Sequence, residues 1–309
     1  MEESAGGPAA PPVPAATGTP GGRKYQQELD VGEAISQTFS LFRHNYSKYL
    51  VVFLPVEGII GGAYTVITTA IQTPVPLTGL TPQEELAQLP GYFESLFLVL
   101  GLVLLISWIV GSLATATAIR LTSEEIEKGE ASVQASFKWA TSKLPSVWAV
   151  SLLYGIIIFF GFLALYVPGI ILGIMFSLAL PAVLIENCGV LDSLGRSRVL
   201  VGHRWSKTFA LFLILGLVLL VPAVAVDLAG TLFGPLNYLA VSLLSALYIP
   251  MIPIFLTVYY YSNVARTAPQ VQLAPTSAVR FCPSCGEPVT EPNQSFCRRC
   301  GNNLRPSQG

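Results

Sequence analysis

Residues 144–185 read LPSVWAVSLLYGIIIFFGFLALYVPGIILGIMFSLALPAVLI and contain no Asp, Glu, Lys or Arg. A single helix over this stretch would be about 63 Å long at ~1.5 Å per residue, roughly twice the thickness of a ~30 Å hydrocarbon core. The stretch must therefore fold back on itself. Tyr166-Val167-Pro168-Gly169 is the expected turn, because proline lacks an amide donor and glycine tolerates turn geometry. We interpret the stretch as a transmembrane hairpin with spans at 146–167 and 169–185.

The composition also indicates a membrane protein. Of the 309 residues, 52% are hydrophobic and only 11% are charged, whereas soluble domains are ~25% charged. The fold class predicted is an all-α polytopic membrane protein with six transmembrane helices and a small C-terminal zinc ribbon. Besides the hairpin, the expected spans are 49–71, 97–121, 208–226 and a last one within 228–265.

The chain divides into four expected parts. Residues 1–28 are rich in Ala, Pro and Gly and are expected to form a disordered tail, because they bury too little apolar surface to offset their ordering entropy. The six-span domain covers 29–265. A Pro/Ala/Gln linker over 266–278 leads to the zinc module over 279–309.

Local signals place several helix ends. Asp30 with Glu33 has capping-box spacing at the start of an amphipathic helix over 30–47. This helix is expected either to lie on the membrane surface or to pack against a neighbouring protein helix. Ser132 is expected to cap a second amphipathic segment, which precedes the hairpin. A third such segment covers 189–205.

The second span is flanked by two further signals. Thr81 and Pro82 are expected to start a short helix inside a loop over 72–92. After the span, the helix is expected to continue to Lys128, with Glu124 and Lys128 paired at i,i+4, and to end at Gly129.

The distribution of charge predicts the topology. If the N-terminus is cytoplasmic, the outer segments are 72–94, the turn at Pro168 and 227–237. None of the seventeen Lys and Arg residues falls in these segments. The positive-inside rule therefore predicts both termini in the cytoplasm.

An internal repeat is also visible. Residues 44–48 read HNYSK and residues 203–207 read HRWSK, and each pentamer ends an amphipathic segment and begins a span. With the middle segment, the chain is interpreted as three units, each a surface helix followed by a hairpin of two spans.

The stretch LGIMFSLALPAVLIENCGVLDSLGRSRVLVGHRW (172–205) resembles the membrane domain attached to some bacterial glycerophosphodiester phosphodiesterases and related stand-alone multi-span proteins. DVGEAISQTFSLFRHNY (30–46) is similar to the opening helix of that group. The resemblance implies a six-span helical domain without catalytic residues. The soluble phosphodiesterase domain has no counterpart in this chain.

The motif FCPSCGEPVTEPNQSFCRRCG predicts a structural metal site. Cys282 and Cys285 form one CxxC pair, Cys297 and Cys300 form the other, and two thiolate pairs suit tetrahedral Zn²⁺. Glycines 286 and 301 follow the pairs, where a knuckle backbone needs permissive dihedral angles. A redox dithiol and an iron site are the alternatives. The module resembles zinc ribbons appended to many prokaryotic proteins, which suggests a prokaryotic plasma membrane.

The partner of the ribbon is less constrained by sequence. Phe281 and Phe296 are expected to form its small core. Protein docking is the favoured use, and nucleic-acid binding is the less favoured alternative, raised by four arginines, Arg280, Arg298, Arg299 and Arg305.

Two acids near the membrane are candidate polar sites, Glu57 within the first span and Asp227 at the outer end of the fifth. The competing interpretation is that each reaches an interface or hydrogen-bonds to a neighbouring helix. Glu186 and Arg196 are expected to pair structurally. His44 and His203 hold matching repeat positions and are expected at the membrane interface rather than in a shared metal site.

Aromatic residues near the span ends are expected at the membrane interface. Three tryptophans (Trp139, Trp148 and Trp205) and the run Tyr259-Tyr260-Tyr261 are expected in the interfacial belt.

The sequence contains no nucleotide-binding loop and no catalytic constellation, so a non-enzymatic role is expected. The leading hypothesis is a membrane scaffold or regulator whose cytoplasmic zinc ribbon docks a protein partner. The alternative is a transporter or lipid-handling protein that uses a cavity near Glu57. The oligomeric state is left open.

Overall fold

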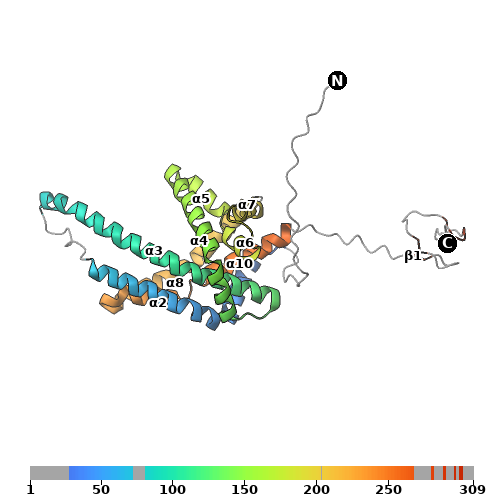
Figure 1. The fold of residues 1–309 in the computed structure, drawn as a ribbon, viewed down its shortest axis with the longest axis horizontal. Helices are drawn as coiled ribbons and strands as arrows, with labels where there is room; N and C mark the ends of the chain where they lie inside the picture. The colour runs from blue at the N-terminus through green and yellow to red at the C-terminus, as the bar shows by residue number, and fades with distance from the viewer. Residues whose placement is uncertain are drawn as a thin grey trace, which may run out of the picture. The chain divides into compact units, whose positions relative to one another are not determined.

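The computed structural model describes residues 28–71, 81–202, 204–267, 280–281, 288–289, 296 and 299–301. Contacts divide the chain into two units, Met1–Thr267 and Ala268–Gly309. The first unit is helical (Figure 1). Its elements are α1 (Val31–His44), α2 (Tyr46–Ala70), α3 (Pro82–Lys128), α4 (Val133–Ala164), α5 (Tyr166–Met175), α6 (Ala179–Ile185), α7 (Val190–Val201), α8 (Trp205–Gly230), the 3₁₀ helix η1 (Thr231–Leu236), α9 (Asn237–Ser245) and α10 (Met251–Thr267).

The start of α1 confirms the predicted capping box. The Glu33 carboxylate accepts a hydrogen bond from the Asp30 amide at 2.9 Å. Ala34, Thr38 and Leu41 are buried, and α1 packs against α10. Of the two expected settings for this helix, packing against a protein helix is therefore the one observed.

The helix α3 is longer than predicted. It begins at Pro82, as expected from the Thr81-Pro82 signal, but it runs without interruption into the second span. The predicted loop over 72–92 is therefore wrong from Pro82 onward. Pro90 removes one backbone hydrogen bond, yet the helix continues through it. The end of α3 matches the prediction, because Lys128 pairs with Glu124 at 3.3 Å and Gly129 takes a left-handed φ of 80°.

The central stretch folds back as predicted, but the turn lies earlier. The Ser132 hydroxyl caps α4, which then runs unbroken through Pro145 to Ala164. Leu165 is extended, and the next helix starts at Tyr166, so Pro168 lies in the first turn of α5 rather than in the chain reversal. Proline is tolerated there because first-turn amides have no partner within the helix.

Glycines allow the two helices of this hairpin to lie close together. A Cβ on Gly161 would lie 2.9 Å from the Cα of Gly169, and a Cβ on Gly169 would lie 2.7 Å from the Phe162 ring. The Tyr154 hydroxyl also donates to the Gly173 carbonyl at 2.9 Å. The antiparallel pairing of α4 with α5 follows from these contacts.

Two apolar segments are interrupted. A turn over 176–178 separates α5 from α6, and Ser197 of α7 bridges it: its hydroxyl donates to the Met175 carbonyl and accepts from the Leu178 amide. A turn over 246–250 likewise separates α9 from α10. Pro250 and Pro253 lack the amides that a continuous helix would need there.

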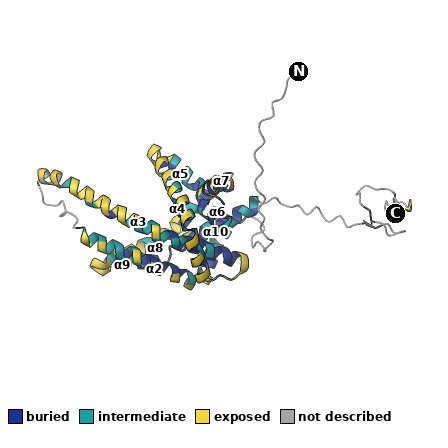
Figure 2. Cartoon of the chain, viewed as in Figure 1, coloured by how far each residue is buried: buried dark blue, intermediate teal, exposed yellow. Residues whose placement is uncertain are grey.

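The helix α10 is the centre of the unit. Figure 2 shows it buried, while the outer surfaces of α3 and α4 are exposed. Tyr259 and Tyr260 are each 1% exposed, so their expected place in an interfacial belt is wrong. Tyr259 is hydrogen-bonded to Thr208 of α8 at 2.6 Å, and Tyr260 donates to Glu186. Neighbouring helical residues point about 100° apart, so the run reaches several helices at once.

Five helical stretches in the described chain are long and apolar enough to cross a membrane. They are Tyr46–Ala70, Leu86–Lys128, Val133–Ala164, Tyr166–Ile185 and Trp205–Ser245. Large apolar side chains such as Phe97, Leu104 and Phe159 are exposed on them, as expected of lipid-facing surfaces. The chain therefore has the architecture of a helical membrane protein. The helix α10, at 17 residues, is not among these five stretches.

The second unit contains a short antiparallel pair in its described part. The strands are β1 (Arg280–Phe281) and β2 (Pro288–Val289), with Arg280 opposite Val289 and Phe281 opposite Pro288. The two strands bracket residues 282–287. Phe296 is 61% exposed, so its expected place in a small core is wrong.

Candidate functional site

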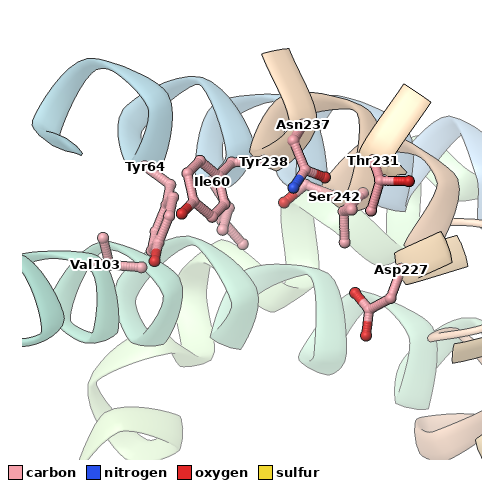
Figure 3. A pocket seen from close by; sticks show the side chains of 9 residues that line it. Ile60, Tyr64, Val103, Asp227, Thr231, Asn237, Tyr238 and Ser242 are labelled. Carbon is pink, nitrogen blue, oxygen red and sulfur yellow. The ribbon is translucent and has the colours of Figure 1, made fainter. Parts of the chain in front are cut away.

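A cavity of about 510 Å³ lies within the helical unit, where α2, α3, α8, η1 and α9 meet. In Figure 3, Asp227 lies at one end of the view and the Tyr64 and Tyr238 side chains at the other. The lining residues come from five elements: Ile60, Tyr64, Val103, Asp227, Thr231, Asn237, Tyr238, Val241 and Ser242. The volume falls within the range of ~300–1,000 Å³ typical of small-molecule sites.

The cavity exists because one wall is made of short, irregular backbone. The helix α8 ends at Gly230, η1 turns the chain, and α9 then runs back against α2. Gly234 adopts a left-handed φ of 53° in this turn, which favours glycine. Close contact between α2 and α9 occurs at Gly61, where a Cβ would lie 2.7 Å from the Cβ of Ser242.

An aromatic pair forms one part of the lining. The rings of Tyr64 and Tyr238 have centroids 4.1 Å apart and are tilted by 58°. Tyr238 is 44% exposed, so the cavity opens at the surface of the helical unit. The pair thus offers aromatic faces and two hydroxyls close to the opening.

Asn237 contributes an unsatisfied polar atom. Its Oδ1 is buried and accepts no hydrogen bond from the part of the chain that the structure describes. Gly230 makes room for it, since a Cβ at this position would lie 2.5 Å from Asn237 Oδ1. Buried polar atoms normally have partners, so this oxygen is an unsatisfied acceptor at the edge of the cavity.

Of the two predicted acids, Asp227 lines the cavity and Glu57 does not. Asp227 is exposed and makes no ion pair or hydrogen bond with another described residue. Glu57 is 7% exposed and likewise has no such partner among the described residues. It precedes Ile60, Gly61 and Tyr64 by one or two turns on the same face of α2, so it lies next to the cavity's wall.

The predicted pair of Glu186 and Arg196 is confirmed. Arg196 Nη2 lies 2.8 Å from Glu186 Oε1, and Arg196 Nε donates to both carboxylate oxygens. Although burial lowers the pKa of Arg196, the hydrogen bond and charge of Glu186 outweigh this effect and raise it. Tyr260 also donates to Glu186, so the pair joins α7 to α10. This arrangement is structural and lies away from the cavity's lining.

The structure describes one of the four predicted metal ligands. Cys282, Cys285 and Cys297 lie outside the described residues, while Cys300 is described and exposed. No group of three or more His, Cys, Asp or Glu side chains suited to a metal occurs among the described residues. Gly301, directly after Cys300, has a φ of 71°, as the sequence predicted for a knuckle. His203, which matches His44 in the repeat, also lies outside the described residues.

Sequence reasoning missed Tyr64, Tyr238 and Asn237. Tyr64 could have been found, because it follows Glu57 by seven residues and so shares its helix face. Nothing local marked Tyr238 or Asn237. They join the site only because the η1 turn brings α9 against α2.

Comparison with known families identifies the family to which most of the chain is similar. A family described as a domain of unknown function (DUF7847) matches residues 44–278. The chain belongs to this family. The match begins at His44 and covers the cavity and all the helices from α2 to α10. Searches of curated proteins and of solved structures found no match. The DUF7847 description names no activity.

Proposed function

We propose that this DUF7847 protein is an integral membrane protein that binds an amphiphilic molecule in the cavity of its helical domain, as a transporter or lipid-handling protein. The observation that carries the proposal is the cavity itself. It combines apolar walls, an unpaired carboxylate and an unsatisfied amide oxygen in a helical domain built for a membrane. A ligand with an apolar chain and a polar head matches this lining.

The test is to fill the cavity with a larger side chain, introduced by a single substitution in α3. Val103 of α3 lines the cavity and is half-buried, whereas the adjacent Leu104 is 58% exposed on the outside. Val103→Trp should remove a co-purified amphiphile, measured by mass spectrometry of the protein extracted from native membranes. Leu104→Trp is the matched control and should retain it. Equal retention by both variants would refute the proposal.

The arrangement in the membrane is proposed to be six spans in three repeats. The fourth span combines α5 with α6, and the sixth combines α9 with α10. Tyr46 and Trp205, which hold the same position in HNYSK and HRWSK, are each the first residue of a long helix.

A second correspondence supports the repeat. Tyr49 is hydrogen-bonded to Thr122 at 2.8 Å, and Thr208 is hydrogen-bonded to Tyr259 at 2.6 Å. Thr208 follows Tyr49 by the same offset that relates the two pentamers. Each hydrogen bond therefore joins the first span of a proposed unit to its second span, with tyrosine and threonine exchanged.

We propose that both termini face the cytoplasm of a prokaryotic cell and that the protein lies in its plasma membrane. Eight Lys and Arg residues occur within 120–207, and none occurs within the proposed outer segments 72–94 and 227–237. The positive-inside rule supports this orientation. Under it, Asp227 and the cavity lie toward the outer side.

A second candidate function is that of a scaffold or regulator whose zinc ribbon docks a protein partner. The observation that favours it is the β1–β2 pair, which brackets the segment with the first two cysteines. Four thiolates would hold a structural Zn²⁺ with no open position for catalysis. Nucleic-acid binding by the arginines of this unit is the less favoured use.

Metal analysis tests the zinc site. Wild-type protein should contain stoichiometric zinc, and replacing Cys282 and Cys285 by Ser should remove it. Cys188→Ser is the control and should leave the zinc in place, because Cys188 belongs to the helical unit. Docking is tested separately by deletion of 279–309. If every co-purified protein remained bound after this deletion, the scaffold proposal would be wrong.

The similarity of 172–205 to the membrane domain of glycerophosphodiester phosphodiesterases remains a proposal. It implies a non-catalytic membrane module, which agrees with a binding role. No enzymatic activity is proposed.

A further inference from the structure

The cavity lining contains an acidic side chain and no basic one. No Lys or Arg occurs between Lys48 and Arg120, or between Lys207 and Arg266. These two intervals contain nearly all of α2, the cavity-lining part of α3, and the whole of η1 and α9. The cavity-lining parts of these helices therefore supply no cation to balance Asp227, the one carboxylate of the lining. A cationic ligand would supply the missing charge.

From this charge we propose that the cavity selects an amphiphile whose head is an ammonium group. The inference rests on the proposed function and specifies the ligand of the same site. Its first argument is Asp227, which is exposed at the cavity and unpaired among the described residues. An ammonium group beside it would form a charge-assisted hydrogen bond, which is stronger than a bond between neutral groups.

The second argument is the excess of acceptors. Asn237 Oδ1 is buried and lacks a donor. The Thr231 hydroxyl already donates to the Leu228 carbonyl at 2.7 Å, so towards the cavity its oxygen can only accept. An ammonium group has donors and no acceptor, and it therefore suits this lining.

The third argument is the pair of tyrosines. The faces of Tyr64 and Tyr238 attract a cation within about 6 Å of a ring centroid. In Figure 3 they lie apart from Asp227, with Asn237 and Ser242 between them in this view. The cavity thus offers a cation favourable surroundings along its length, while Ile60, Val103 and Val241 provide apolar surface for a chain.

The same groups disfavour an anionic head. A phosphate or carboxylate would lie near Asp227 without an Arg or Lys from these helices to bind it. Like charges at short range repel, and anions in proteins are normally bound by cationic side chains or clusters of amides. The expected order of affinity is therefore ammonium, then neutral, then anionic heads.

Three probes with one chain test this order. Dodecylamine, dodecanol and dodecanoate differ only in the head, and their binding to the full-length protein in a neutral maltoside detergent is measured by native mass spectrometry. Dodecylamine should bind about tenfold tighter than dodecanol, the advantage of one charge-assisted hydrogen bond. Dodecanoate should bind most weakly.

Two variants test whether Asp227 causes the preference for dodecylamine. Asp227→Asn keeps the shape and should abolish the tenfold preference for dodecylamine over dodecanol. Glu94→Gln is the matched control, because Glu94 is an exposed acid of α3 that does not line the cavity, and it should keep the preference. An unchanged preference in Asp227→Asn, or a preference for dodecanoate, would overturn the inference.

Butylamine, which has the ammonium head without the long chain, tests whether the site requires an amphiphile. It should not displace dodecylamine at similar concentration. Displacement would mean that the site takes free amines and would overturn the amphiphile part of the inference. If all three long probes bind equally to wild type and are lost in Val103→Trp, the cavity function stands and the ammonium inference fails. If none binds, both fail.

Discussion

The two ends of the helical unit differ in whether their carboxylates are paired. At the end that holds Tyr259–Tyr261, which we call the polar end, the tyrosine hydroxyls are hydrogen-bonded to neighbouring helices and Glu186 is paired with Arg196, while Asn263 Oδ1 and Arg266 Nε have no hydrogen-bond partner among the described residues. At the end that holds the cavity, which we call the cavity end, an acid and a buried amide oxygen have no partner among the described residues. Paired charged groups stabilise a fold, whereas an unpaired carboxylate that is exposed at a cavity can bind a ligand.

The chain start illustrates the difference. Glu28 lies 3.2 Å from Arg204 and also pairs with Lys207, which in turn donates to the Leu29 carbonyl at 2.9 Å. The segment before α1 is thereby fixed to α8 at the polar end. Asp227, near the other end of α8, has no cation to bind. The helix α8 thus carries a paired charge, Lys207, near its start and an unpaired charge, Asp227, near its end.

The largest expected effect comes from removing a tyrosine at the polar end. Tyr259→Ala should lower the free energy of unfolding by about 3–5 kcal/mol, because the side chain is fully packed and hydrogen-bonded. Tyr238→Ala, at the cavity end, should cost less than about 1.5 kcal/mol, since its side chain is already partly exposed. Thermal unfolding in detergent measures both. Equal losses would mean that the two ends are packed alike.

Tyr259→Phe refines this comparison. It keeps the ring stacked on Phe255 and removes only the hydroxyl that bonds Thr208. The expected loss is about 1 kcal/mol, the net contribution of one hydrogen bond.

The sequence predicted those features of the fold that depend on neighbouring residues. The capping box at Asp30, the cap at Ser132 and the stop at Gly129 are local, and all three are observed. The reversal of the central hairpin was also predicted, because its length exceeds a membrane thickness. Its turn was misplaced by a few residues, since proline suits a first helical turn as well as a loop.

What could not be predicted depends on contacts between distant segments. The tyrosines of α10 look like an interfacial belt in sequence, and only the packing of α10 among other helices buries them. The cavity likewise requires η1 to return α9 against α2. Asp227 is a candidate from sequence because an acid near a span is costly unless it is used, and the structure places it in the lining of the cavity. Nothing in the sequence joined it to Asn237 or Tyr238.

A smaller effect is expected from two adjacent glycines at the cavity end. Gly61→Ala should cost about 1–3 kcal/mol, because its Cβ would lie 2.9 Å from the Leu239 Cα and closer still to Ser242. Gly62→Ala meets nothing within 4 Å and should be neutral or stabilising by up to about 1 kcal/mol through helix propensity. Denaturant unfolding measures both. A harmless Gly61→Ala would show that α2 and α9 are not in tight contact.

The smallest effect concerns the one thiol of the polar end. Burial raises the pKa of Cys188, and the negative charge of Glu186 raises it further. Alkylation by iodoacetamide should therefore be slow at pH 8 and should still be rising at a pH where an ordinary thiol, with a pKa of ~8.5, has levelled off. Site-resolved mass spectrometry separates Cys188 from the four cysteines of the C-terminal motif. Glu186→Gln should increase the rate a few-fold, and Asp192→Asn, whose charge has a weaker influence on the thiol, should increase it less. The reverse order would mean that Asp192 rather than Glu186 is the dominant negative charge at the thiol, as expected if the charge of Arg196 largely cancels that of Glu186.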